Sequence, residues 1–76
     1  KIYSASEKAN ALYTQINASE PLMLVMGSEE SGVSPTMLKM SDELVKIPMK
    51  GEIESLNVSA AASILLFEVV RQRLGI

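Results

Sequence analysis

The apolar residues of this chain fall into short continuous runs and longer repeats with helical spacing. Residues 22–26 are continuously apolar and residues 44–47 are nearly so, which is typical of parallel strands buried on both faces. Three segments around these runs have features of helices. The predicted order is helix, strand, helix, strand, helix, and such an alternation favours an α/β fold with a parallel sheet.

The first predicted helix covers residues 5–16. Ser4 and Glu7 match a capping box at its start, in which each side chain satisfies a free amide of the first turn. The apolar positions at helical spacing are Ala5, Ala9, Leu12 and Ile16. Residues 17–21 then predict a turn that ends at a proline.

Two further helices have recognisable starts. Ser34 and Pro35 suit the N-cap and first position of a short helix that ends near Met40. Asn57 can cap a long helix over residues 58–74, which is rich in alanine early and charged late.

The composition indicates more buried surface than so short a chain provides. It has 76 residues, of which 47% are hydrophobic and 21% charged, whereas a domain of this size buries only about 60% of its unfolded surface. Two predicted strands also make an incomplete sheet, so we expect at least two or three more strands upstream of Lys1. We interpret the chain as the C-terminal part of a larger cytoplasmic protein.

Several classes of chemistry are excluded or disfavoured. The chain has no cysteine and no histidine, so it lacks thiolate ligands, imidazole ligands and the commonest general base, and we expect no metal. Its net charge of −2 provides no evident basic face for nucleic acid. The longest uncharged apolar run, residues 58–67, is shorter than the roughly 20 residues that span a bilayer, so we expect no membrane insertion.

The loop after the first predicted strand begins and ends with glycine. It reads Gly27-Ser28-Glu29-Glu30-Ser31-Gly32. The Lys-Ser/Thr pair that a nucleotide-binding P-loop requires after its second glycine is absent, which argues against a triphosphate site. Gly27 would let a ligand approach the strand end, and Gly32 would allow a sharp loop. The alternative is a tight strand-to-helix connection without a ligand.

The second loop follows the other predicted strand. Ile47 and Met49 flank a proline, which donates no backbone hydrogen bond and marks a strand end. Ser55 and Asn57 lie two residues apart just before the long helix. Asn57 can act simply as an N-cap, and Met49 and Leu56 can be ordinary core residues. Both loops would lie at one edge of the sheet, where α/β proteins commonly bind ligands.

Together the two loops resemble the second and third signature motifs of the SpoU/TrmH family. Its members are S-adenosylmethionine-dependent RNA 2′-O-ribose methyltransferases of the SPOUT superfamily, and the match is greatest to those that methylate a guanosine ribose in large-subunit ribosomal RNA. The resemblance spans about residues 22–73. It implies that residues 1–76 are the C-terminal part of a trefoil-knot catalytic domain, an α/β domain with a partial parallel sheet and flanking helices. The loops around Gly27 and Ile53 would belong to the knot.

The resemblance also implies site residues. S-adenosylmethionine would be bound by Gly27, Ile47, Met49 and Leu56, mainly through backbone groups, with the Met49 side chain walling the pocket. The active site would include Glu29, Ser55 and Asn57. A carboxylate at Glu29 could orient donors near the cationic sulfonium, and its alternative role is that of a solvated loop acid.

Two features depart from the family pattern. Glu30 stands where the family often has glycine, and the first motif, with its catalytic arginine, has no counterpart in the 76 residues. We therefore expect the parent protein to methylate RNA, with ribosomal RNA favoured over transfer RNA, and the 76 residues alone to be inactive. The alternative is a non-catalytic module that only dimerises and binds the cofactor.

The helix predicted over residues 58–74 is apolar around most of its circumference. One sheet face can cover only one side of a helix, so a second surface is required to cover the rest. A self-complementary patch of this kind suits a two-fold contact. We therefore predict a homodimer, in agreement with the resembled family.

Overall fold

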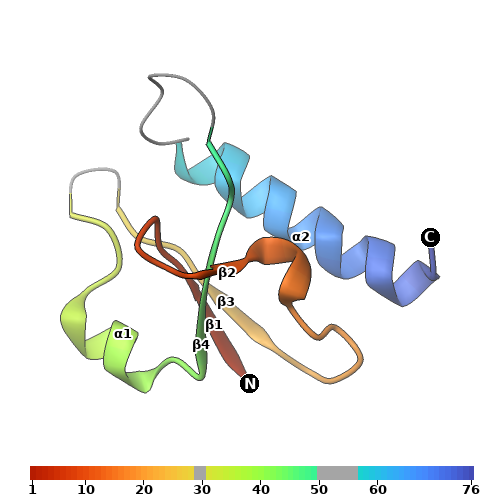
Figure 1. The fold of residues 1–76 in the computed structure, drawn as a ribbon, viewed down its shortest axis with the longest axis horizontal. Helices are drawn as coiled ribbons and strands as arrows, with labels where there is room; N and C mark the ends of the chain where they lie inside the picture. Colours follow the sequence, from red (N-terminus) through yellow and green to blue (C-terminus); the bar gives the residue numbers. More distant parts are fainter. Residues whose placement is uncertain (29–30, 50–56) are drawn as a thin grey trace.

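A computed structural model describes residues 1–28, 31–49 and 57–76. The elements in chain order are β1 (Ile2–Ala5), β2 (Ala11–Leu12), the 3-10 helix η1 (Tyr13–Gln15), β3 (Met23–Val25), α1 (Pro35–Met40), β4 (Glu43–Lys46) and α2 (Val58–Leu74). The strands form a four-stranded sheet in the order β2-β4-β1-β3, and every pair is parallel. The predicted α/β class with a parallel sheet is confirmed (Figure 1).

The predicted helix over residues 5–16 is wrong. This segment contains the end of β1, the short strand β2 and η1. Ser4, expected to cap a helix, is fully buried in β1, and its hydroxyl shares a hydrogen bond with that of Ser41. The backbone of β1 pairs with β3 on one side and with β4 on the other. This long-range pairing outweighs the helical preference of the alanine-containing repeat, because intrinsic propensity yields to tertiary contacts.

The remaining predicted elements are confirmed, with small shifts at their ends. Strands β3 and β4 occupy the two apolar runs. The Ser34 hydroxyl accepts the Met37 amide at 3.2 Å and caps α1, which has proline in its first turn. Helix α2 ends at Gly75, which adopts φ +75°. This left-handed conformation suits glycine at a helix C-terminus.

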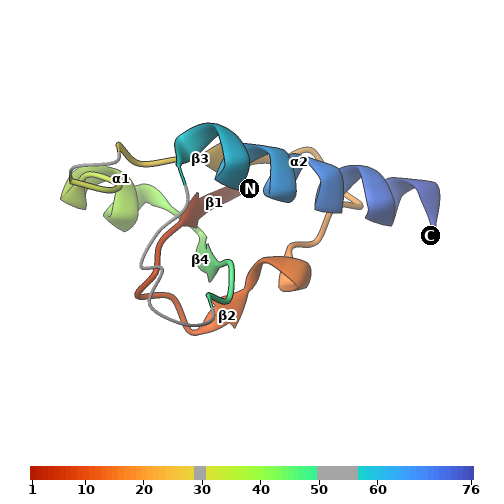
Figure 2. The same cartoon turned by 90° about the horizontal axis from the view of Figure 1, so that it is seen from above.

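The two α-helices lie on opposite sides of the strands in both views (Figures 1 and 2). The core lies between the sheet and α2 and contains Tyr3, Ile16, Ala18, Val45, Leu65 and Val69. The Tyr3 hydroxyl accepts the Asn17 amide at 3.0 Å, which joins the central strand to the connection before β3. On the α1 side, the Ser41 hydroxyl donates to the Met37 carbonyl at 2.7 Å.

The sheet contains two strands that the sequence pattern did not predict, and both lie within the chain. Strand β2 lies within the predicted first helix and β1 overlaps that helix only at Ala5, so four strands, and not two, come from the residues that the structure describes. In the part of the chain that the structure describes, no helix is long and apolar enough to cross a membrane.

Candidate functional site

The ends of three neighbouring strands define one edge of the sheet. Strand β1 lies between β3 and β4, and all three run in the same direction. Ser4 is level with both Val25 and Leu44 in the register. The loops that follow β3 and β4 therefore leave the sheet at its carboxyl edge, and α2 begins on that side of the molecule (Figure 1). Parallel α/β proteins bind their ligands outside this edge.

Gly27 lies at this edge, but the structure gives its lack of a side chain a different reason from the predicted one. A Cβ atom at Gly27 would lie 2.2 Å from the Gly32 carbonyl carbon and 2.3 Å from the Val33 amide nitrogen. The glycine therefore lets the loop fold back on its own backbone. The Ser28 hydroxyl accepts the Ser31 amide at 3.1 Å, and Gly32 has φ +69°. The expected sharp loop at Gly32 is confirmed.

Ile47 and Met49 follow β4 at the same edge. Ile47 is half-buried, and Met49 retains 39% of its surface exposed. An exposed methionine beside a partly buried isoleucine provides an apolar surface at the strand end. Such a surface suits a neutral heterocycle such as adenine, which needs covered faces and a few polar contacts along its edge.

Asn57 is the N-cap of α2, as the sequence predicts. Its Oδ1 atom accepts the Ala60 amide at 2.8 Å and caps α2, and the residue is exposed. The cap uses the side-chain oxygen only. The amide group of an asparagine carries two further donors, so capping and a second contact at this edge are compatible.

The other predicted site residues, Glu29, Ser55 and Leu56, lie outside the described residues, as does Ile53 of the predicted knot. The structure thus places the loop starts at Gly27 and at Ile47 and Met49 at the same sheet edge, on either side of β1, and it places Asn57 at the start of the helix that follows.

Sequence reasoning missed the middle of this edge. Ser6 and Glu7 follow β1 and lie between the loops after β3 and β4. The sequence pattern predicts a helix over these residues, so it gives no indication that they lie at the edge. The Ser6 amide donates to the Val45 carbonyl at 2.9 Å, which holds this strand end against β4. The continuous apolar run that marks β3 is missing in β1, where Ser4 interrupts it, so the sequence carries only a weak signal for a strand here.

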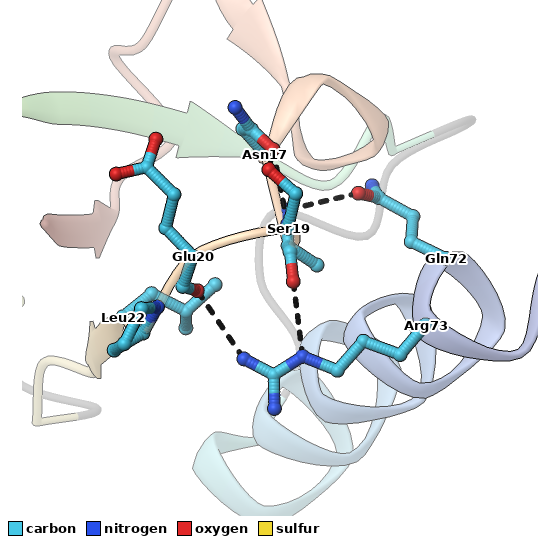
Figure 3. A pocket seen from close by; sticks show the side chains of 8 residues that line it. Asn17, Ser19, Glu20, Leu22, Gln72 and Arg73 are labelled. Atoms are coloured by element: carbon cyan, nitrogen blue, oxygen red, sulfur yellow. Dashed lines mark hydrogen bonds between the residues drawn. The ribbon is translucent and has the colours of Figure 1, made fainter.

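A surface hollow lies near the amino end of β3, away from the carboxyl edge, between the connection that precedes β3 and the last turns of α2 (Figure 3). Its lining residues are Asn17, Ala18, Ser19, Glu20, Pro21, Leu22, Gln72 and Arg73. None of the predicted site residues that the structure describes lines it. Arg73 donates through Nε to the Ala18 carbonyl at 3.0 Å and through a terminal nitrogen to the Glu20 carbonyl at 3.3 Å.

Glu68 is the buried acid of this region, with 6% of its surface exposed. Its carboxylate accepts two hydrogen bonds from Arg71, at 2.8 and 2.9 Å, and one from Gln72 at 2.7 Å. The hydrogen bonds from Arg71 lower the pKa of Glu68 most, burial opposes them, and the bond from Gln72 lowers it further, to about 2. The carboxylate is therefore held in its charged form.

The arrangement defines an α/β domain with a parallel sheet and a ligand-type edge formed by loops after neighbouring strands. The model of the SpoU rRNA Methylase family matches residues 1–67. The chain belongs to this family.

Two proteins of similar sequence are named as guanosine-2′-O-methyltransferases that act on RNA. The chain is 46% identical over 72 residues to the 23S rRNA (guanosine-2′-O-)-methyltransferase RlmB of Haemophilus influenzae, covering 95% of this chain and 29% of the relative. It is 39% identical over 74 residues to the tRNA (guanosine(18)-2′-O)-methyltransferase of Thermus thermophilus, covering 96% of the chain and 38% of the relative.

Among solved structures, the SpoU methyltransferase AviRb from Streptomyces viridochromogenes, in complex with AdoMet, matches with a TM-score of 0.89 and 33% identity. That match covers 96% of this chain and 28% of the AviRb chain. The chain thus spans less than a third of the length of AviRb and of the Haemophilus influenzae relative.

Proposed function

We propose that the full-length protein containing this chain transfers a methyl group from S-adenosylmethionine to a ribose 2′-hydroxyl of RNA in the cytoplasm. Ribosomal RNA is the favoured substrate and transfer RNA the alternative, since relatives named for each match the chain. The observation that carries the proposal is that the loops after β3 and β4 leave the sheet at the same edge, on either side of β1, in a chain of the SpoU family.

The residues at this edge suit the cofactor. Ile47 and Met49 offer apolar surface, and the backbone of Gly27 and Leu56 would complete the pocket. The cofactor supplies an electrophilic methyl group when it is bound. The protein must then hold the ribose hydroxyl in line with that group and help to remove its proton, which is poorly acidic.

The remaining residues have roles by family analogy. Glu29 and Ser55 would organise the surroundings of the hydroxyl, and the amide donors of Asn57 would position a polar group beside them. Because Asn57 caps α2 through Oδ1, its Nδ2 atom is the group that we assign to this contact.

We further propose that the 76 residues do not catalyse methyl transfer alone. They represent the C-terminal part of a catalytic domain, since the first family motif and its arginine have no counterpart in them. Methyl transfer by the isolated 76-residue polypeptide at the rate of the full-length protein would contradict this assignment.

We also propose that the protein forms a homodimer. Helix α2 leaves Leu66, Phe67 and Val70 exposed at 57%, 69% and 42%. A second copy can cover this surface through a two-fold contact, in which the same patch on each chain is used.

Two measurements on the full-length protein test the proposed activity. Titration calorimetry with S-adenosylmethionine should show saturable binding. Transfer of a radiolabelled methyl group to a ribosomal RNA transcript should require guanosine carrying a 2′-hydroxyl, so that a transcript with 2′-deoxyguanosine at the modified position is inert. Binding without transfer to ribosomal or transfer RNA would favour the non-catalytic module, and absence of binding would exclude the cofactor site.

A further inference from the structure

Helix α2 is apolar on both of its long faces. The inward face carries Leu65 and Val69, which are buried, but also Glu68 and Gln72. The outward face carries larger apolar side chains in the same turns, namely Leu66, Phe67, Val70 and Leu74, with exposures from 42% to 69%. Burial of apolar surface alone would therefore favour the opposite orientation for the C-terminal half of the helix.

Hydrogen bonds to the connection before β3 explain the observed orientation. Ala18 is 2% exposed, and both of its backbone polar groups bond to α2. Its amide donates to Gln72 Oε1 at 3.0 Å, and its carbonyl accepts from Arg73 Nε at 3.0 Å. A buried backbone group without a partner bears the full cost of its lost hydration. Rotation of α2 by half a turn would leave both groups of Ala18 unpaired.

Glu68 orients the side chain that makes the first of these bonds. Gln72 donates through Nε2 to the Glu68 carboxylate at 2.7 Å and to the Thr14 carbonyl at 3.5 Å. With Nε2 held between two acceptors, Oε1 faces the amide of Ala18. Arg71 balances the charge of Glu68 from the solvent side. The inward face therefore carries a connected polar network.

We propose that Glu68 and Gln72 select the rotational orientation of α2, and thereby decide which apolar face the helix offers to a second copy of the chain. The orientation is a property of the single chain. The consequence for assembly rests on the homodimer proposed above.

The test removes the network and adds no large apolar side chain to the inward face. Glu68→Ala combined with Gln72→Ala is prepared in the full-length protein with methyl-labelled Ile, Leu and Val. In the wild-type protein, nuclear Overhauser contacts should join Leu65 and Val69 to Ile16. In the double variant, a second set of contacts should appear, from Leu66 or Val70 to Ile16, while far-ultraviolet circular dichroism retains the helical signal.

Leu65→Ala is the matched control. It removes the most deeply buried apolar side chain of the inward face and leaves the network intact, so a single set of contacts from Val69 to Ile16 should persist. Sedimentation of the same samples should show at least tenfold weaker self-association for the double alanine variant than for Leu65→Ala.

Two outcomes would overturn the proposal. One is a single, wild-type set of contacts in the double variant. The other is loss of its helical signal, which would mean that the network holds the helix in place and does not choose its face. A wild-type protein that sediments as a monomer would remove the proposed dimer but would leave the contacts to Ile16 as a test of the orientation.

Discussion

At the scale of single residues, the two loop glycines are required for different reasons. Gly27→Ala would place a Cβ atom against the backbone of Gly32 and Val33, whereas the space around Gly32 is open and only its φ of +69° is unfavourable for alanine. We expect Gly27→Ala to lower the free energy of unfolding by at least about 2 kcal/mol and Gly32→Ala by about 1 kcal/mol. Chemical denaturation of the full-length protein measures both, and an equal cost would contradict the close backbone contact.

Glu68 gives the protein a pH-dependent contribution to stability. Its pKa in the folded state is about 2, below its ordinary 4.5. A lowered pKa stabilises the folded state above the ordinary value, and this contribution is lost as the pH falls from about 4.5 to about 2. We expect Glu68→Gln to lower the free energy of unfolding by about 2 kcal/mol at pH 7, with the difference from wild type shrinking at acidic pH. A difference that stays constant down to pH values near 2 would show that the charge is not responsible.

At the scale of elements, the start of α2 combines a cap with a proposed contact, and substitutions of Asn57 separate the two. Asn57→Asp keeps an oxygen for the Ala60 amide but loses the amide donors. We expect this variant to keep its stability and lose at least tenfold in methyl transfer. Asn57→Ala should lose activity and also about 1 kcal/mol of stability. Wild-type turnover of the aspartate variant, measured with the radiolabelled methyl assay, would leave Asn57 a structural cap only.

The first elements show how pairing partners override a local pattern. Ala5, Ala9 and Ile16 match helical spacing, but Ala9 and Ile16 are buried on either side of β2, in a segment that contains no α-helix. Strand β1 is stabilised by pairing with β3 and β4, which follow about 20 and 40 residues later in the chain. No window of adjacent residues contains that information, because strand preference depends on what lies beside the strand.

At the scale of the whole molecule, the exposed face of α2 predicts self-association. A charge at Leu66, which is 57% exposed, should leave the fold of one chain intact and oppose burial against a second copy. We expect Leu66→Glu in the full-length protein to sediment as a monomer at micromolar concentration, where wild type sediments as a dimer. Thr36→Glu, on the exposed surface of α1, is the control and should remain dimeric. A wild-type monomer would exclude the dimer.

The sequence by itself determined the elements whose signals are local. The apolar runs predicted β3 and β4, and the capping residues Ser34 and Asn57 predicted the starts of α1 and α2, because caps and buried strands depend on adjacent residues. The two loop motifs identified the family. They also placed Gly27, Ile47, Met49 and Asn57 near one sheet edge.

Only the tertiary structure decided what depends on partners distant in the chain. It assigned β1 to the middle of the sheet, and it showed that Gly27 is packed against its own loop. It also turned Glu68 and Gln72 of α2 inward and Phe67 outward. Apolar periodicity could not decide that orientation, because both faces of α2 are apolar, and the buried backbone of Ala18 accepts only the face that completes its hydrogen bonds.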